Sequence, residues 1–500
     1  MEFYATESTA ADVWPAHLCY TRDPVTLTTL PFLPMTLAAM LFPAWAAGQQ
    51  PAAAPAQRPG PPSGLAQEVD AYVEPYVKMN TFSGMVLIAK DGKIELERGY
   101  GMANYELAVP SGRQTRYHIA SMSKPFTAAA VLLLQEEGKL KVSDPLSRFI
   151  PDFPRGDSIT LHHLLTHTSG IHNINDLPDY DAWSRFPQKL EAIIARFKDL
   201  PLDFAPGAKY SYSNSNYNLL AYVIEKASGQ KYGEFITNRI LRPLRMDSSG
   251  VDDDPSVLIP ERADGYLPWG ADSLAKAPYL DWSIKTGNGS IYSTAEDLLK
   301  LDQALYSDRL LSAASRKQMF AAQFEDRIGY GWFLGKRNGK KVARINGRSP
   351  GFTAEMHRYV DDKVTIIVLS NNYSSASQSM IADLGAIYFR LPYQRSKPLD
   401  RRVAKPGELA RYAGRYRFGQ EFYVPNGEYQ IEDRGDHLAM VYDPGNVYAL
   451  VPLTSGAFFQ RTFGGEVRFI TGPGGEITKL TWETDGRTFE AAKISNGHLP

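Results

Sequence analysis

A serine three residues before a lysine is a spacing that could generate a nucleophile. The pattern Ser-x-x-Lys occurs three times in this chain, at Ser121/Lys124, Ser228/Lys231 and Ser273/Lys276. A serine hydroxyl is a weak nucleophile until a neighbouring group takes its proton. A lysine amine held partly out of water could accept that proton, or lower the pKa of another base. Because so short a pattern recurs by chance, the surrounding sequence must decide which pair could do this chemistry.

The surroundings favour the first pair. Residues 126–135 (FTAAAVLLLQ) are apolar on nearly every side, which predicts a buried helix, and Gly138 predicts its end. Ser121 stands just before this helix, near the positive end of the helix dipole, and Lys124 follows one turn later on the same face. The competing interpretation is a helix-capping serine beside a lysine that is only a surface charge.

The other two pairs have weaker surroundings. Ser228 precedes Gly229 at the end of an apolar helical run, which predicts a helix terminus with a solvated Lys231. Ser273 lies in a polar stretch (GADSLAKAP) in which we predict no helix or strand. Neither serine is therefore a strong candidate nucleophile.

The rest of the pattern predicts an α+β fold. Helical spacing occurs in residues 65–78 and 378–389, and strand character occurs at 84–89, 94–98, 353–358 and 364–369, the last a continuous apolar run. From about residue 140 to 330, helical patterns alternate with loops rich in Pro, Gly and Asn. Strands, a helical insertion, further strands and a final helix indicate one sheet with helices packed against it.

Composition excludes several classes of protein. Five hundred residues suggest two to four domains, and 43% hydrophobic with 22% charged residues is typical of a globular chain. Lys and Arg number 54 against 55 Asp and Glu, so there is no basic excess for binding nucleic acid. The single cysteine, Cys19, excludes a disulfide scaffold and a cysteine-rich zinc module.

Residues 1–47 predict a signal or other targeting segment. Residues 27–47 are largely apolar, but three prolines interrupt them, which a membrane-spanning helix tolerates poorly. The small residues around Ala46 resemble a cleavage site, whereas the preceding segment is acidic rather than basic. Residues 48–64 predict a Pro/Ala-rich linker. We therefore expect a periplasmic or secreted protein without a stable membrane span, with an anchored form as the alternative.

The last hundred residues are all-β in style. A charged, proline-bearing stretch at 397–406 predicts a linker, and beyond it turn signals recur between short alternating segments such as 466–470 and 479–482. This rhythm predicts a small antiparallel barrel over residues 407–498.

Four segments resemble, in the family's order, the class C β-lactamase-like, penicillin-binding serine hydrolases. They are residues 117–127 (YHIASMSKPFT), 164–171 (LLTHTSGI), 212–214 (YSN) and 289–298 (GSIYSTAEDL). The resemblance implies a β-lactamase/transpeptidase-like domain over residues 65–396, in which an antiparallel sheet is flanked by helices and carries a helical insertion. It also implies a covalent acyl-enzyme at Ser121. The C-terminal barrel resembles the lipocalin-like domain appended to some members.

The same resemblance assigns Ser121, Lys124 and Tyr212 as catalytic residues and Asn214 as a substrate contact. A phenol of ordinary pKa near 10 is a poor base at neutral pH, but a nearby cation such as Lys124 would favour the phenolate. Asn214 could offer a donor and an acceptor to an amide or ester. Whether Lys124 or Tyr212 accepts the serine proton stays open. Without the resemblance, this tyrosine would be an ordinary residue of an Asn-rich turn.

The family's third element, Lys-Thr-Gly or His-x-Gly on a strand beside the nucleophile, has two candidates here. A literal Lys285-Thr286-Gly287 directly precedes the segment 289–298, whose family counterpart lies away from that strand. We interpret it as a chance match. The better counterpart is residues 345–352 (INGRSPGF), placed by its Pro-Gly-Phe and the strands that follow. In that alignment Ile345 occupies the cationic position.

The remaining residues of this third element have expected roles. Asn346, Gly347 and Arg348 are candidate substrate contacts, since Gly347 allows close approach of the backbone. The backbone amides of Ser121 and Arg348 would form the oxyanion hole. Arg344 or Arg348 could replace the missing cation, although neighbouring residues on a strand point to opposite faces.

The loss of a cation at Ile345 affects the expected substrate. It weakens the interpretation as a β-lactamase or D-Ala-D-Ala carboxypeptidase more than it weakens acyl transfer, and related family VIII esterases also vary here. We expect an esterase, or a peptidase for small D-amino-acid substrates such as a D-aminopeptidase. The alternative from another class is a catalytically impaired member that binds a ligand or partner.

No cofactor or metal is expected. His163 and His167 are four residues apart, but no carboxylate-centred zinc pattern accompanies them or His162, and His167 matches a structural turn of the family. The expected partner is a small-molecule ester or peptide substrate, with no nucleic acid. The barrel leaves assembly into an oligomer open.

Overall fold

The computed structural model describes residues 63–393, 399–443, 446–484 and 486–495. The predicted targeting segment 1–47 and nearly all of the predicted linker 48–64 lie outside the described residues. Among the described residues, no helix combines the length and the apolar character needed to cross a bilayer.

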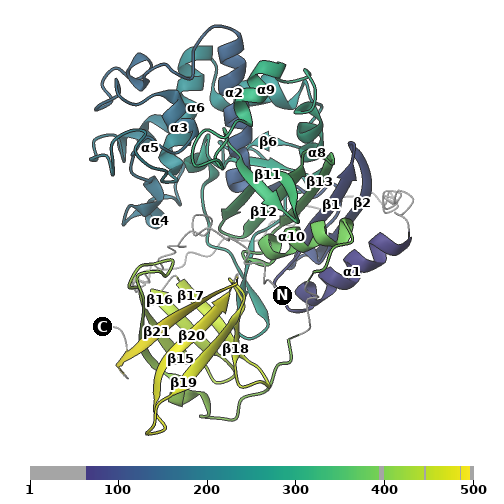
Figure 1. Cartoon of the computed structure of the whole chain (residues 1–500), viewed down its shortest axis with the longest axis vertical. Helices are drawn as coiled ribbons and strands as arrows, with labels where there is room; N and C mark the ends of the chain where they lie inside the picture. Colours follow the sequence, from purple (N-terminus) through teal and green to yellow (C-terminus); the bar gives the residue numbers. More distant parts are fainter. Residues whose placement is uncertain (1–62, 394–398, 444–445, 485, 496–500) are drawn as a thin grey trace, which may run out of the picture.

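A six-stranded antiparallel sheet forms the centre of the larger part of the molecule (Figure 1). Its strands lie in the order β10 (Phe333–Arg337), β11 (Lys340–Ser349), β12 (Phe352–Tyr359), β13 (Val364–Ser370), β1 (Gly84–Lys90) and β2 (Lys93–Tyr100). Strand β1 pairs with β13 from Gly84↔Ser370 to Lys90↔Val364, so the two halves of the sheet join across the helical insertion. The predicted α+β fold is confirmed.

Each face of the sheet packs against different helices. Val86 and Ile88 of β1 belong to the core shared with α1 (Ser63–Lys78) and α10 (Ala376–Tyr388). Met85 and Leu87 point to the other face and join the core of the helical insertion. Because side chains alternate along a strand, β1 needs apolar residues at every position, which explains its uninterrupted apolar run.

The helical insertion surrounds one buried helix, α2 (Lys124–Glu136), in which every residue from Lys124 to Leu134 is buried. The helix ends at the predicted place, since Gly138 follows it with a left-handed φ of 71°. The other helices of the insertion are α3 (Leu161–Leu165), α4 (Tyr180–Trp183), α5 (Leu190–Ala195), α6 (Asn214–Ser228), α7 (Tyr232–Ile236), α8 (Ala295–Ala304) and α9 (Ala313–Met319).

Short strands complete this part of the chain. They are β3 (Met102–Asn104), β4 (Val109–Pro110), β5 (Tyr117–His118), β6 (Gly250–Val251), β7 (Tyr266–Trp269), β8 (Ser273–Lys276) and β9 (Ile291–Ser293). The expectation that Ser273 lies outside any element is wrong, because it begins β8, which pairs with β7 as a hairpin. The other expectation is confirmed: α6 ends at Ser228, with Gly229 as its left-handed cap.

The C-terminal segment forms a closed antiparallel barrel, as predicted. Its strands are β14 (Gly414–Phe418), β15 (Glu428–Asp433), β16 (Leu438–Asp443), β17 (Asn446–Pro452), β18 (Phe458–Gln460), β19 (Glu466–Thr471), β20 (Ile477–Thr484) and β21 (Arg487–Ser495). Pairing of β14 with β21 closes it. The interior is filled by large side chains such as Tyr416, Phe458 and Trp482.

One buried arginine joins the barrel to the larger part of the molecule. Arg461 is 2% exposed, and its guanidinium donates to the carbonyl oxygens of Trp269, Gly270 and Ser273 in the β7–β8 hairpin, at 2.7, 2.8 and 3.0 Å. It also donates to the carbonyl of Met79 at 3.0 Å. The barrel is therefore held against the β7–β8 hairpin and the end of α1, and it lies below the central sheet in Figure 1.

Candidate active site

Ser121 lies in a 3₁₀ turn, Ala120–Ser123, that leads directly into α2. Ala120, the residue before it, has a left-handed φ of 46°, which costs a non-glycine residue of order 1 kcal/mol. This local strain turns the half-buried Ser121 out of the core and into a pocket, whereas Met122 and Ser123 are buried. Strained backbone of this kind is concentrated at functional sites.

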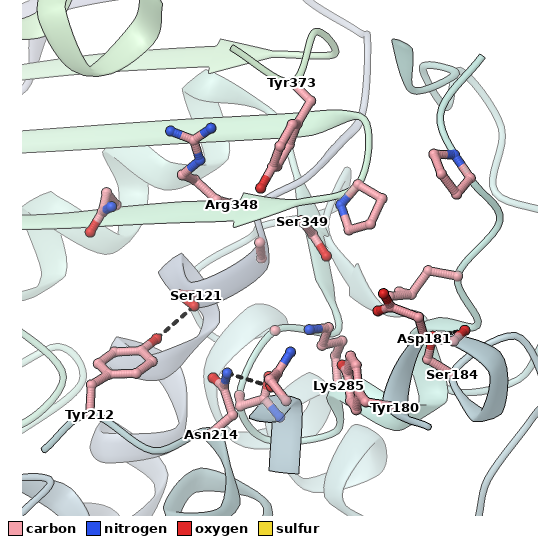
Figure 2. Close-up of a pocket in the computed structure, with 18 of the residues that line it drawn as sticks. Ser121, Tyr180, Asp181, Ser184, Tyr212, Asn214, Lys285, Arg348, Ser349 and Tyr373 are labelled. Atoms are coloured by element: carbon pink, nitrogen blue, oxygen red, sulfur yellow. Dashed lines mark hydrogen bonds between the residues drawn. The ribbon is translucent and has the colours of Figure 1, made fainter. Parts of the chain in front are cut away.

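Two side chains converge on the Ser121 hydroxyl. The Lys124 Nζ lies 3.0 Å from the Ser121 Oγ. The Tyr212 phenol donates a hydrogen bond to the same oxygen at 2.8 Å (Figure 2). The structure thus brings together the three residues that the sequence predicted as catalytic. It gives no support to the competing interpretation of Lys124 as a surface charge, because this lysine is 1% exposed.

The surroundings of Lys124 favour an uncharged amine. Burial, followed by the nearby charge of Lys285, lowers the pKa of Lys124 well below its ordinary value. Asn214 Oδ1 and the carbonyl of Asn288 each accept a hydrogen bond from Nζ at 3.0 Å. An uncharged amine has two N–H groups and one lone pair. In that uncharged form, with both N–H groups bound, the lone pair would face the Ser121 hydroxyl, which is the arrangement of a general base.

Burial opposes the phenolate that we expected a charged Lys124 to favour at Tyr212. Burial raises the pKa of the Tyr212 phenol above its ordinary value, and the hydrogen bond with Ser121 only partly opposes this. Desolvation penalises the charged phenolate relative to the neutral phenol. At neutral pH Tyr212 keeps its proton and acts as a donor.

The start of α6 positions Tyr212 and Asn214. Asn214 is the first residue of the helix, and its backbone N–H donates to Asn173 Oδ1 at 2.9 Å. Its side-chain amide donates to Asn175 Oδ1 at 2.7 Å, so the carbonyl oxygen of that amide faces Lys124. The Asn-rich sequence is therefore the N-terminus of a buried helix and not an isolated turn.

His167 has the structural role that the sequence suggested, and it also contacts Tyr212. Its Nδ1 accepts a hydrogen bond from the backbone N–H of Ser213 at 3.2 Å, and its ring stacks on the Tyr212 ring at 4.3 Å. Burial lowers the pKa of His167 well below its ordinary value, so the imidazole is neutral and able to accept. Within the described residues, no group of three or more His, Cys, Asp or Glu side chains could hold a metal.

At Gly347, strand β11 approaches the turn that carries Ser121. A Cβ atom on Gly347 would lie 2.0 Å from the carbonyl oxygen of Ile119 and 3.1 Å from the amide nitrogen of Ser121. Only glycine permits this approach. The strand that we predicted as the third element therefore does lie against the nucleophile turn, with the Arg348 amide next in the chain.

We expect Gly347→Ala to lower kcat for ester hydrolysis by about 100-fold, because the new methyl group would push β11 away from Ser121 and misalign the oxyanion donors. Gly335→Ala on the neighbouring strand β10 is the matched control, since nothing lies within 4 Å of the added Cβ. Steady-state kinetics of both variants measure the effect. Equal rates in the two variants would show that close packing at Gly347 is unimportant for turnover.

The side chains of the other residues of the third element do not all point toward Ser121. Ile345 and Asn346 line the pocket. The guanidinium of Arg348 donates to Ser375 Oγ at 3.0 Å and lies over the rings of Tyr373 and Phe463, at 4.7 and 5.4 Å from their centroids. Figure 2 shows it directed away from Ser121. The barrel therefore reaches the edge of the site through Phe463.

Sequence reasoning missed Lys285 as a site residue. The literal Lys-Thr-Gly does not lie on the strand beside the nucleophile: Lys285 ends a 3₁₀ turn, Trp282–Lys285, and Gly287 packs against Tyr217 of α6. The interpretation as a chance match to the third element is consistent with this placement. Even so, the Lys285 side chain enters the same pocket as Ser121. The sequence signal that could have found it is its position four residues before the family segment 289–298.

One pocket of about 140 Å³ is lined by Ser121, Tyr212, Asn214, Lys285, Ile345 and Asn346, among others. Ser121, Tyr212 and Asn214 lie on one side, and β11 forms another wall (Figure 2). The far wall carries Tyr180 and Asp181 from α4. The pocket combines a candidate nucleophile, a buried amine, a phenol donor and a strand edge, which is a set of groups that acyl transfer could use.

Comparisons with known proteins agree with this geometry. The family described as Beta-lactamase matches residues 69–386. A penicillin-binding protein of Bacillus subtilis (strain 168) is 31% identical over 447 residues, covering 82% of this chain and 95% of that protein. Among solved structures, a penicillin-binding protein from Bacillus halodurans has a TM-score of 0.56 and 28% identity, covering 64% of this chain and 99% of that one. A D-stereospecific amidohydrolase from Streptomyces sp. has a TM-score of 0.52 and 25% identity, covering 62% and 94%.

Proposed function

Because this chain belongs to the Beta-lactamase family, we propose that it is a serine hydrolase acting through a covalent acyl-enzyme at Ser121. The observation that carries the proposal is the convergence of Lys124 and Tyr212 on the Ser121 hydroxyl, at 3.0 and 2.8 Å. A nucleophile within hydrogen-bond reach of a base, which is itself oriented by further groups, is the signature of an activated serine.

In the proposed reaction, Ser121 Oγ attacks the substrate carbonyl carbon while its proton passes to the Lys124 amine. The carbonyl oxygen becomes an oxyanion that accepts hydrogen bonds from the backbone amides of Ser121 and Arg348. The C–O or C–N bond to the leaving group then breaks, and the leaving group takes a proton delivered through Tyr212, which Lys124 restores. A water molecule attacks the acyl-enzyme in the same way, releasing the acid and free Ser121.

We propose esters and small amides, including D-amino-acid derivatives, as the substrates. Ile345 places an apolar side chain where the family carries a cation or an imidazole, which disfavours β-lactams and peptides that end in a free carboxylate held there. The likeness to a D-stereospecific amidohydrolase supports small amides of D-residues. The apolar segment 27–47 supports export of this hydrolase to the periplasm or the medium.

The proposal predicts a burst of p-nitrophenol when the protein is mixed with p-nitrophenyl acetate, with about one equivalent released before steady turnover. Rapid acid quenching, digestion and mass spectrometry should find an acetyl group on the peptide that contains Ser121. Release of p-nitrophenol without any acylated peptide, or acylation at another residue, would contradict a Ser121 acyl-enzyme. Absence of both would favour the catalytically impaired alternative.

A further inference from the structure

Lys285 presents a buried positive charge to the pocket. Its side chain is 8% exposed and lies beside Ser121 and Asn214 with its amine directed into the cavity (Figure 2). The ammonium lies 5.4 Å from the centroid of the Tyr180 ring. Within the part of the chain that the structure describes, no side chain or carbonyl accepts a hydrogen bond from it. A desolvated ammonium without an acceptor is costly, so this lysine needs a reason to be here.

The backbone around Lys285 is fixed by the same turn that orients the base. The Lys285 carbonyl accepts hydrogen bonds from the amides of Asn288 and Gly289, at 2.9 and 2.7 Å. The Asn288 carbonyl in turn accepts from Lys124. The position of the Lys285 side chain is therefore coupled to the geometry around Ser121, as expected of a group that contacts the substrate.

The position of Lys285 relative to Ser121 suggests which part of a substrate it meets. In Figure 2, Tyr212 and Lys285 lie on opposite sides of Ser121. The leaving group must lie near Tyr212 to receive its proton, so the acyl group extends toward Lys285. Other charged groups on that wall are Asp181, Asp176 and Arg185. Asp181 raises the pKa of Lys285, but burial has the larger effect and lowers the value to about 8, which leaves the amine largely charged at neutral pH.

We propose that Lys285 binds a carboxylate carried by the acyl part of the substrate, so that this hydrolase prefers acyl donors with a negative charge remote from the scissile bond. The inference rests on the proposed function and adds a specificity to it. The binding cation would then not lie on β11, the strand of the third element that carries Ile345. It would lie on the turn that ends at Lys285, on the acyl side of Ser121. A substrate carboxylate would supply the acceptor that Lys285 lacks.

The test compares matched esters that differ in charge at one end. Mono-p-nitrophenyl esters of adipic and pimelic acid carry an acyl carboxylate, and their methyl esters are neutral controls of nearly equal length. For the natural protein we expect kcat/KM to be about 10- to 100-fold higher for the acids than for the methyl esters. Lys285→Met should reduce this ratio to about 1, whereas Lys285→Arg should keep most of it. Because Lys285 also lowers the pKa of Lys124, its loss changes all rates, but that effect cancels in the ratio.

A third substrate tests the assigned side. In 4-carboxyphenyl acetate the carboxylate is on the leaving group, so its rate relative to phenyl acetate should be the same in the natural protein and in Lys285→Met. The inference is overturned if the ratio of kcat/KM for the acids to that for their methyl esters is already about 1 in the natural protein, or is unchanged by Lys285→Met. Hydrolysis that still depends on Ser121 would then leave the proposed function standing. If Lys285→Met instead lowers the rate of 4-carboxyphenyl acetate relative to phenyl acetate, and leaves the ratio of acids to methyl esters unchanged, the acyl-side assignment is overturned. Turnover that survives Ser121→Ala overturns the proposed function itself.

Discussion

Ser121→Ala is expected to reduce kcat for short-chain p-nitrophenyl esters by about 10⁴- to 10⁶-fold. The variant lacks the oxygen that forms the covalent bond, so neither the burst nor the acylated peptide should appear. The residual rate would come from the remaining donors of the site acting on water. Because Ser121 is only half-buried and its loss removes one hydroxyl, the melting temperature should change by no more than a few degrees.

The chain provides its own control for this substitution. Ser228 heads another Ser-x-x-Lys, but it lies at the C-terminus of α6, where its hydroxyl donates to the carbonyl of Ile224 at 2.6 Å. Ser228→Ala should leave kcat within about twofold of the natural protein. If Ser121→Ala hydrolysed esters at the natural rate while Ser228→Ala did not, the nucleophile would have been assigned to the wrong repeat of the motif.

The second large effect is expected for Lys124→Met, which should lower kcat by about 10³- to 10⁴-fold, at the upper end of what a general base contributes. Methionine fits the buried path of the lysine stem but cannot accept a proton. Lys124→Arg should be similarly inactive, because a guanidinium keeps its proton at every accessible pH. Together the two variants distinguish a base from a positive charge. Activity retained in the arginine variant would contradict the assignment of Lys124 as the proton acceptor.

The pH dependence of kcat/KM checks the same role. Lys124 can accept the serine proton only when it is uncharged, so activity should fall as the pH decreases through its pKa. Since burial and Lys285 lower the pKa of Lys124 well below the ordinary 10.5, this acid limb should lie far below that of a free lysine. Lys285→Met removes a like charge, which raises the pKa of Lys124 and should move the acid limb to higher pH. Lys231→Met is the control, because this lysine side chain is 73% exposed and should change neither rate nor profile.

Much of the architecture could be predicted from local sequence. The run of apolar residues in α2, the uninterrupted apolar strands β1 and β13, and the turn signals of the barrel each specify an element without knowledge of its neighbours. The short strands outside the central sheet were harder to predict, as Ser273 shows. Its strand β8 is polar and half-exposed, and it exists because it pairs with β7 next to the barrel. Such strands carry no apolar alternation, so their sequence gives little signal.

The candidate site was also predictable only in part. The resemblance of the Ser-x-x-Lys and Tyr-x-Asn segments to the family's motifs was sufficient to predict that Lys124 and Tyr212 meet at the Ser121 hydroxyl. Their protonation could not be predicted. Either a charged Lys124 promotes a phenolate at Tyr212, or Lys124 loses its own proton. Which of the two is favoured depends on how completely both side chains are buried, and burial is a property of the packed core.

The sequence, together with its family resemblance, determined the candidate nucleophile Ser121, the helix α2 that follows it and the strand of Gly347, since each is encoded within a few neighbouring residues. Only the tertiary structure decided which cation enters the pocket. Arg348 is adjacent to Gly347 in sequence, but Ser375, Tyr373 and Phe463 engage its guanidinium. Lys285 lies far from that strand in sequence, but the packing of its turn against α6 brings its amine beside Ser121. Side-chain direction depends on contacts between distant segments, and those contacts exist only in the folded chain.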